Sequence, residues 1–173
     1  MEALGLLFDN QKDVIERQLL KMQDGRTAWM FGYRIHPIRK NPDGSPLRQF
    51  HNGVDLPNPE GYPIKLPLSG TLIKFWLDDK FGGGNSIVFT HTNATFIRTG
   101  YAHLHNFADG LIMGSTYPAG TVIGYVGNTG VGTGPHLHFT GSQIVNGQSQ
   151  QVDPLPFLCS ACGVAELPIH PVG

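Results

Sequence analysis

The sequence is poor in charge. Charged residues make up 14% of the 173 residues, against about 25% in an average globular protein. The 12 basic and 13 acidic side chains nearly cancel, which leaves a formal net charge of −1. Proteins that bind nucleic acid through phosphate contacts carry a clear excess of lysine and arginine. We therefore expect no nucleic-acid partner.

Cysteine is almost absent. The two cysteines, Cys159 and Cys162, are separated by only two residues near the end of the chain. Two thiols so close together cannot cross-link distant parts of a fold, so a disulfide framework is excluded.

Long hydrophobic runs are also missing. No segment approaches the roughly 18 uncharged apolar residues that a membrane-spanning helix needs, so no membrane span is expected. The first nine residues, Met1–Asp9, contain no basic residue, and their apolar run is short. A secretory signal peptide is therefore not predicted.

Glycine and proline are plentiful, at 23 and 13 residues, and 40% of the chain is hydrophobic. Short β-rich runs bounded by Gly, Pro, Asn and Asp predict strands. These runs cover Ile64–Leu68, Gly70–Leu77, Asn85–His91, Phe96–Leu104, Thr121–Val126 and His136–Ile144. No amphipathic helical pattern separates them, which favours antiparallel over parallel pairing.

Three further segments complete the predicted organisation. Apolar residues at helical spacing over Asn10–Met22 predict a short amphipathic helix, with Asp9 or Asn10 as its cap. Pro42–Arg48 is predicted to be a polar loop, and the prolines after Asp153 predict an irregular tail. The predicted fold class is mainly β: an antiparallel β-sheet core with a short N-terminal helix and an irregular, proline-rich tail.

Histidine is abundant, with eight residues, and three short segments concentrate side chains suited to metal ligation. The segment His51–Asp55 has the pattern H-x-x-x-D. In His136–His138, the two imidazoles point to one side of a strand and Leu137 points to the core. In Tyr101–His105, alternation predicts that Tyr101, His103 and His105 share one strand face.

Together these segments predict a hydrolytic zinc site. Catalytic zinc takes three nitrogen or oxygen ligands and leaves a fourth position for water. Two neutral histidines and one aspartate supply that set, and the remaining histidines can transfer protons or stabilise developing negative charge. The residues alone leave open which histidines bind the metal.

The order of these motifs resembles the lysostaphin/LytM-type zinc metallopeptidases. The resemblance rests on H-x-x-x-D, then Tyr-Ala-His-Leu at 101–104, then Thr-Gly-Pro-His-Leu-His-Phe at 133–139. Further matching segments are Phe31–Pro37, Ile123–Gly130 and Val152–Pro154. The match runs from about residue 31 to residue 158.

The resemblance implies a function and a role for each site residue. It implies an antiparallel β core with an active-site groove, and cleavage of peptide bonds in bacterial peptidoglycan. His51, Asp55 and His138 match the zinc ligands, whereas His103 and His136 match the catalytic pair. His105 receives no role and is expected to be exposed to solvent. The implied domains are a helical extension (1–30), the zinc metallopeptidase domain (31–158) and a C-terminal tail (159–173).

Two other functions are compatible with a β fold rich in histidine. One is a phosphocarrier-like protein that uses a histidine as phosphate acceptor, and the other is a catalytically silent wall-binding module. A wall-cleaving domain without a signal peptide also suggests a phage-encoded enzyme for entry or lysis. Such an enzyme would be located in the virion tail, with tail proteins as partners, or be released to the cell wall or periplasm.

Overall fold

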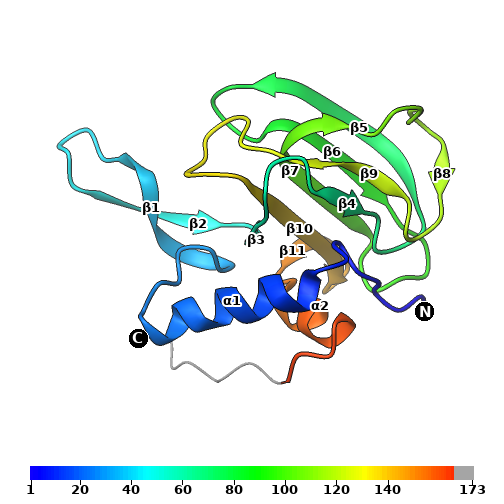
Figure 1. The fold of residues 1–173 in the computed structure, drawn as a ribbon, viewed down its shortest axis with the longest axis horizontal. Coiled ribbons are helices and arrows are strands. Elements are labelled where there is room, and N and C mark those ends of the chain that lie inside the picture. Colours follow the sequence, from blue (N-terminus) through cyan, green and yellow to red (C-terminus); the bar gives the residue numbers. More distant parts are fainter. Residues whose placement is uncertain (166–173) are drawn as a thin grey trace.

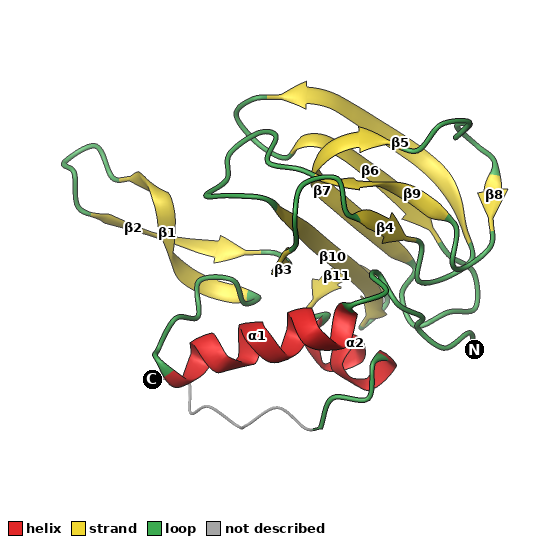
Figure 2. Ribbon diagram, viewed as in Figure 1, coloured by secondary structure: helices red, strands yellow, loops and turns green. Residues whose placement is uncertain are grey.

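A computed structural model describes residues 1–165 of the chain. It is built mainly from antiparallel strands, with one helix near each end of the described part (Figures 1 and 2). The elements are α1 (Gln11–Gln23), β1 (Gly32–Lys40), β2 (Pro46–His51), β3 (Val54–Pro57), β4 (Pro63–Lys65), β5 (Gly70–Asp79), β6 (Gly84–Thr90), β7 (Arg98–Phe107), β8 (Thr116–Tyr117), β9 (Val122–Val126), β10 (His136–Val145), β11 (Gln148–Val152) and α2 (Leu155–Ala161). The predicted fold class is confirmed.

The strands form two sheets. Nine strands make the main sheet, with the order β11-β10-β7-β6-β5-β8, while β3 pairs with β10 and β9 pairs with both β4 and β7. β1 and β2 form a separate two-stranded hairpin that projects from the main sheet (Figure 1). All of these pairings are antiparallel.

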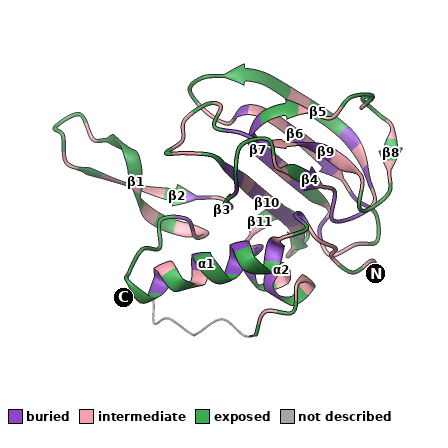
Figure 3. Cartoon of the chain, in the orientation of Figure 1, coloured by how far each residue is buried: buried purple, intermediate pink, exposed green. Residues whose placement is uncertain are grey.

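The hairpin corrects the prediction of a polar loop over Pro42–Arg48. A tight turn is closed by the Gly44 N–H, which donates to the Asn41 carbonyl (2.9 Å), and β2 already begins at Pro46. β1 and β2 are largely exposed (Figure 3). Because a strand that is not half-buried needs no alternation of apolar and polar residues, the sequence carried no strand signal here.

The second correction concerns the tail, which was predicted to be irregular from Asp153 onward. The structure has helix α2 at Leu155–Ala161, with Leu155 and Leu158 fully buried. Proline is tolerated in the first turn of a helix, where its missing N–H has no intrahelical partner. Pro154 and Pro156 therefore mark the start of a helix. The end of the predicted tail, 166–173, lies outside the described residues.

Helix α1 confirms the predicted amphipathic helix and joins the central core. Val14, Ile15 and Met22 are buried on one face of α1, and the same cluster includes Leu137 and Leu158. The predicted cap is absent: the helix start has no side-chain capping hydrogen bond. Instead, the side-chain amides of Asn10 and Asn58 donate to each other's Oδ1 atoms (3.0 and 3.1 Å).

Burial is concentrated where the helices and the central strands meet (Figure 3). Phe139 of β10 and Tyr101 of β7 are opposite each other in the register and pack with ring centroids 5.4 Å apart. Within residues 1–165, neither helix combines the length and apolar character that a membrane crossing requires.

Candidate metal centre and active site

The pairing of β3 with β10 sets Asp55 directly opposite His138. Residues opposite each other in an antiparallel pair point to the same side of the sheet. The neighbouring pair, Leu56 and Leu137, points to the other side and is fully buried. One register therefore directs Asp55 and His138 to the same face and anchors both strands in the core.

A close turn between β2 and β3 brings His51 to the same place. At Gly53, a Cβ atom would lie 2.3 Å from the carbonyl oxygen of Phe139, which is too close for any side chain. Glycine therefore allows the turn to pass directly over β10. As a result, the two outer residues of H-x-x-x-D face each other although they belong to different strands.

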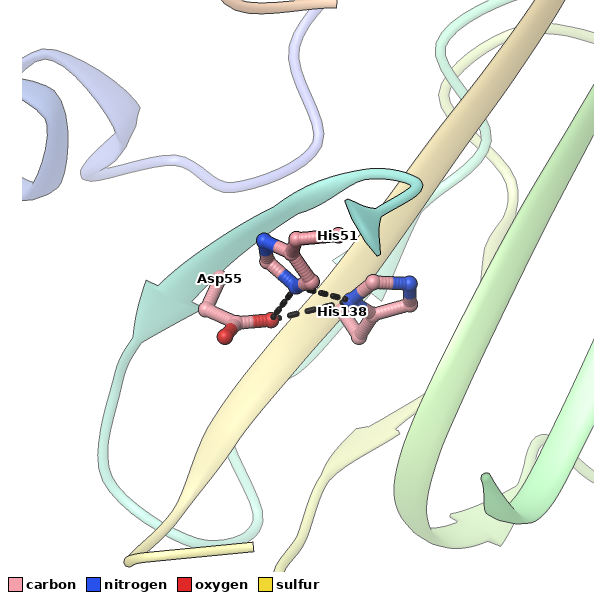
Figure 4. A group of neighbouring side chains, drawn as sticks. All are labelled: His51, Asp55 and His138. Carbon is pink, nitrogen blue, oxygen red and sulfur yellow. Dashed lines mark hydrogen bonds and ion pairs between the residues drawn. The ribbon is translucent and has the colours of Figure 1, made fainter. Parts of the chain in front are cut away.

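The three side chains present one donor atom each to a common point (Figure 4). Oδ1 of Asp55 lies 2.9 Å from Nδ1 of His138 and 3.2 Å from Nε2 of His51, and the two nitrogens are 3.1 Å apart. Bond lengths of about 2.0–2.1 Å in tetrahedral zinc sites correspond to ligand atoms about 3.3 Å apart. The spacing of this donor triangle therefore fits zinc with a small expansion.

The outer nitrogens of both histidines have acceptors. Nδ1 of His51 lies 2.8 Å from the carbonyl oxygen of Met30, and Nε2 of His138 lies 2.9 Å from Oδ1 of Asn52. A neutral imidazole that donates through one nitrogen offers the lone pair of the other. These acceptors thus fix the tautomers in which both lone pairs point into the donor triangle.

The electrostatics keep the donors in their ligating forms. Burial opposes ionisation of Asp55, but the adjacent imidazoles of His138 and His51 outweigh it and hold the pKa of the carboxyl well below its ordinary value. Burial lowers the pKa of His138, although Asp55 opposes this effect. At neutral pH the site therefore combines a carboxylate with a neutral His138.

His103 and His136 lie beside the donor triangle with their rings 4.7 Å apart. Nε2 of His136 is 3.7 Å from Oδ1 of Asp55, and its Nδ1 lies 2.8 Å from the carbonyl oxygen of Gly134. Nδ1 of His103 lies 2.7 Å from the carbonyl oxygen of Thr129. Burial, reinforced by His136, lowers the pKa of His103 to about 4.

The prediction that Tyr101, His103 and His105 share one strand face is wrong. Tyr101 points into the core, where its hydroxyl lies 2.9 Å from Oγ1 of Thr99. His103 has a left-handed backbone (φ 64°) that reverses the alternation and turns its ring to the site. His105 is exposed, as expected, and its Nδ1 lies 2.8 Å from a carboxylate oxygen of Glu60.

Residues near the N-terminus support Asp55 from three directions, which sequence reasoning missed. Nε2 of Gln18 donates to the main-chain carbonyl oxygen of Asp55 (2.8 Å). The main-chain N–H of Asp55 donates to the carbonyl oxygen of Trp29 (2.9 Å). Nη1 of Arg34 lies 3.3 Å from Oδ2 of Asp55. Gln18 interrupts the apolar face of α1, and a buried polar residue at such a position was the one available signal.

The five site residues lie together in a groove with a cavity of about 590 Å³. The hairpin β1–β2 forms one wall with residues that include Arg34 and Arg39, and residues 82–83 and 131–133 form the other. Nη2 of Arg39 donates to the carbonyl oxygen of Phe81 and so links the hairpin to the opposite wall. The donor triangle therefore faces the cavity between these two walls.

Comparisons with known proteins agree with this geometry. The model of peptidase family M23 matches residues 49–154, and the chain belongs to this family. It is 38% identical over 125 residues to the DD-carboxypeptidase/endopeptidase Mpg of Neisseria meningitidis, covering 71% of this chain and 25% of that protein. The chain thus spans about a quarter of the length of this relative.

Two solved structures are similar in fold and sequence. The catalytic domain of the antimicrobial peptidase lysostaphin from Staphylococcus simulans matches with a TM-score of 0.52 and 30% identity, over 82% of this chain and 96% of that one. A zinc-containing peptidase from Vibrio cholerae matches with a TM-score of 0.51 and 29% identity, over 80% of this chain and 41% of that one. Membership of family M23 argues against the phosphocarrier-like alternative.

Proposed function

We propose that this chain is a zinc-dependent endopeptidase that cleaves peptide bonds in bacterial peptidoglycan. His51, Asp55 and His138 are the zinc ligands, and His103 and His136 are the catalytic residues. The observation that carries the proposal is the donor triangle, whose three atoms lie within 3.2 Å of one another at the bottom of an open groove. Few arrangements of protein side chains other than a metal site bring two imidazole nitrogens and a carboxylate oxygen so close together.

The relatives support the reaction type. Mpg is named a DD-carboxypeptidase and endopeptidase, and lysostaphin is named an antimicrobial peptidase. The segment matched by the family model, residues 49–154, contains the proposed ligands. We assign residues 31–158 to the peptidase domain, with 1–30 and 159–173 as flanking segments.

The proposed chemistry divides between the ligands and the two other histidines. Zinc, when bound, supplies Lewis acidity, which polarises a peptide carbonyl and brings the pKa of water from 15.7 towards about 7. His136, with Nε2 facing the donor triangle, accepts the proton of the attacking water and passes it to the leaving amine. His103 lies beside His136 with Nδ1 facing the carbonyl oxygen of Thr129, so its Nε2 offers a second lone pair for proton transfer.

The acidic residues of the site favour peptide over glycoside cleavage. Glycoside hydrolysis generally uses two carboxyl groups on opposite sides of the scissile bond. Asp55 is the single carboxylate that lines the described groove, and its role as a ligand occupies it. The proposal therefore predicts new amino termini and no new reducing ends.

Digestion of purified peptidoglycan tests this function. The fragments are analysed by mass spectrometry for new amino termini and by a reducing-sugar assay. The His136→Ala variant is the matched control and should release neither product. Release of reducing ends without amines would contradict the proposal. Binding to peptidoglycan without any cleavage would favour the catalytically silent module.

The biological setting is a separate part of the proposal. We propose that the enzyme acts for a phage, at entry from the virion tail with tail proteins as partners, or at lysis after release to the cell wall or periplasm. Both steps require local opening of peptidoglycan, which is the reaction proposed for the site. Immunodetection in purified virions and in lysates tests this setting, and detection in uninfected, prophage-free cells would overturn it.

A further inference from the structure

A second cavity, of about 690 Å³, adjoins the active-site groove. Its lining comes largely from residues that precede the segment matched by the family model, at the end of α1 and in the following turn at 25–29. The two cavities share five lining residues: Arg34, Pro37, Asp55, Thr133 and His136. The two cavities therefore adjoin at the donor triangle.

The charged lining of the second cavity is strongly unbalanced. Three cations, Lys21, Arg26 and Arg34, face one carboxylate, Asp55, which already interacts with Arg34. Arg26 also pairs with Asp24 at 2.9 Å, but both side chains are about two-thirds exposed, and such pairs are weak. This local positive charge contrasts with the net charge of −1 of the whole chain.

Two details indicate that these cations lack sufficient negative partners within the described protein. Burial and the neighbouring charge of Arg26 lower the pKa of Lys21, so the environment disfavours its positive charge. Nε of Arg34 is buried and has no hydrogen-bond partner among the described residues, although Nη1 donates to the carbonyl oxygen of Ala28 (2.7 Å). An anion in the cavity would relieve the unfavourable interaction of Lys21 with Arg26.

The rest of the lining is suited to the apolar part of a peptide. Trp29 is 93% buried, and its ring lines the cavity together with Pro57 and Pro135. Apolar walls exclude water, and charge interactions beside them are stronger than in bulk solvent. The cavity therefore combines an apolar surface with cations near its rim.

We propose that this cavity is a substrate subsite that binds a carboxylate of an acidic peptide, held by Lys21 and Arg26 while Trp29 contacts the adjoining backbone. The inference rests on the proposed peptidase function and names its substrate class: peptides with a free carboxylate several atoms away from the scissile bond. The carboxylate is either the C-terminus of a stem peptide or an internal acidic group.

Amidation of the substrate tests the subsite directly. Soluble fragments of purified peptidoglycan are compared before and after conversion of their carboxylates to carboxamides. Because Lys21 and Arg26 are partly exposed, we expect kcat/KM to fall severalfold on amidation. The same preference should appear in the Kd of a synthetic stem pentapeptide measured by calorimetry.

Charge-neutral variants connect this preference to the cavity. Lys21→Gln and Arg26→Gln should each lower the preference for free carboxylate, measured as the ratio of kcat/KM for the free and the amidated fragments, severalfold. Lys12→Gln is the matched control, because Lys12 is an exposed lysine of the same helix that does not line the cavity. It should keep the full preference.

Two singly amidated pentapeptides distinguish the two sources of the carboxylate. Loss of binding on amidation of the C-terminus alone identifies the terminal carboxylate, and loss on amidation of the internal group alone identifies the acidic residue. Equal binding of all forms to the wild type, or an unchanged preference in both cavity variants, overturns the subsite. If peptidoglycan is not cleaved at all, the proposed function fails, whereas the calorimetric comparison still decides the subsite.

Discussion

The backbone of His103 is left-handed, with φ at 64°. This conformation costs a residue with a side chain roughly 1–2 kcal/mol, although histidine and asparagine tolerate it better than most. This backbone conformation breaks the alternation of side chains along β7 and directs the ring of His103 towards His136. Asparagine is therefore the substitution that removes the imidazole with least disturbance of the backbone.

Substitution at the five site residues separates the proposed metal ligands from the proposed catalytic residues. His51→Ala, Asp55→Ala and His138→Ala should each lose most of the bound zinc and lower the Tm, because the metal binds only the folded state. His136→Ala and His103→Asn should keep zinc and lose activity by about 10²-fold or more. Zinc is measured by elemental analysis and activity by the release of amines.

His105→Ala is the internal control for these variants. Its side chain is about half exposed and pairs with Glu60, away from the donor triangle. We expect near-normal zinc content and activity. Loss of zinc in His136→Ala together with normal zinc in His138→Ala would reverse the roles proposed for the two histidines.

Local pattern at the residue scale was enough to group the candidate site. The spacing in His136–His138 fixes both imidazoles on one side of a strand, and the structure brings them next to Asp55. The contacts of Met30 and Asn52 with the outer histidine nitrogens were not predicted. A main-chain carbonyl has no sequence signature, and an asparagine beside a glycine is equally typical of an ordinary turn.

Among the elements, α1 is linked to the proposed metal centre through Gln18, whose amide supports the main chain of Asp55. Partners that orient metal ligands typically change metal affinity by about 10–100-fold when they are mutated. We expect Gln18→Ala to weaken zinc binding by about tenfold, as measured by competition with a chromophoric chelator. The measurement is made well below the Tm of the variant, so that unfolding does not contribute.

Gln23→Ala provides the matched control, because Gln23 is the exposed last residue of the same helix. It should bind zinc as tightly as the wild type. Equal affinity in the Gln18 and Gln23 variants would mean that α1 is a packing element without influence on the site.

Elements were predictable where burial imposed a period on the sequence. Helix α1 and six strands of the main sheet (β4, β5, β6, β7, β9 and β10) were indicated by their apolar residues, whereas β3, β8 and β11 were not predicted. The exposed hairpin β1–β2 has no such period, and the prolines of α2 gave the opposite signal. The missed elements are short or exposed strands, or depend on the exact position of proline.

Across the whole molecule, buried histidines make stability depend on pH. The pKa of His103 is lowered from 6.5 to about 4, mainly by burial, and burial also lowers the pKa of His91 and His138. Between these pH values the unfolded chain binds more protons than the folded one, so stability falls as the pH falls from 6.5 to about 4. The contribution of His103 is on the order of 3 kcal/mol.

Thermal unfolding of the chelator-treated protein at pH 7 and pH 5 measures this effect. We expect a lower Tm at pH 5, and a smaller difference between the two pH values in His103→Asn. His105→Asn, at an exposed position, should retain the full difference. A Tm that does not change between pH 7 and pH 5 would contradict the burial of neutral histidines.

Asp55 and His138 are 83 residues apart in the sequence, yet their donor atoms are neighbours. A zinc ion held by both would close a loop of that length, as a disulfide does in secreted domains. Because the ion binds only the folded state, its stabilising effect depends on the concentration of free metal. The free thiols Cys159 and Cys162 close no comparable loop. The folded chain should therefore tolerate reducing agents and be vulnerable to chelators, so that the availability of metal, and not the redox state of its surroundings, limits where it persists.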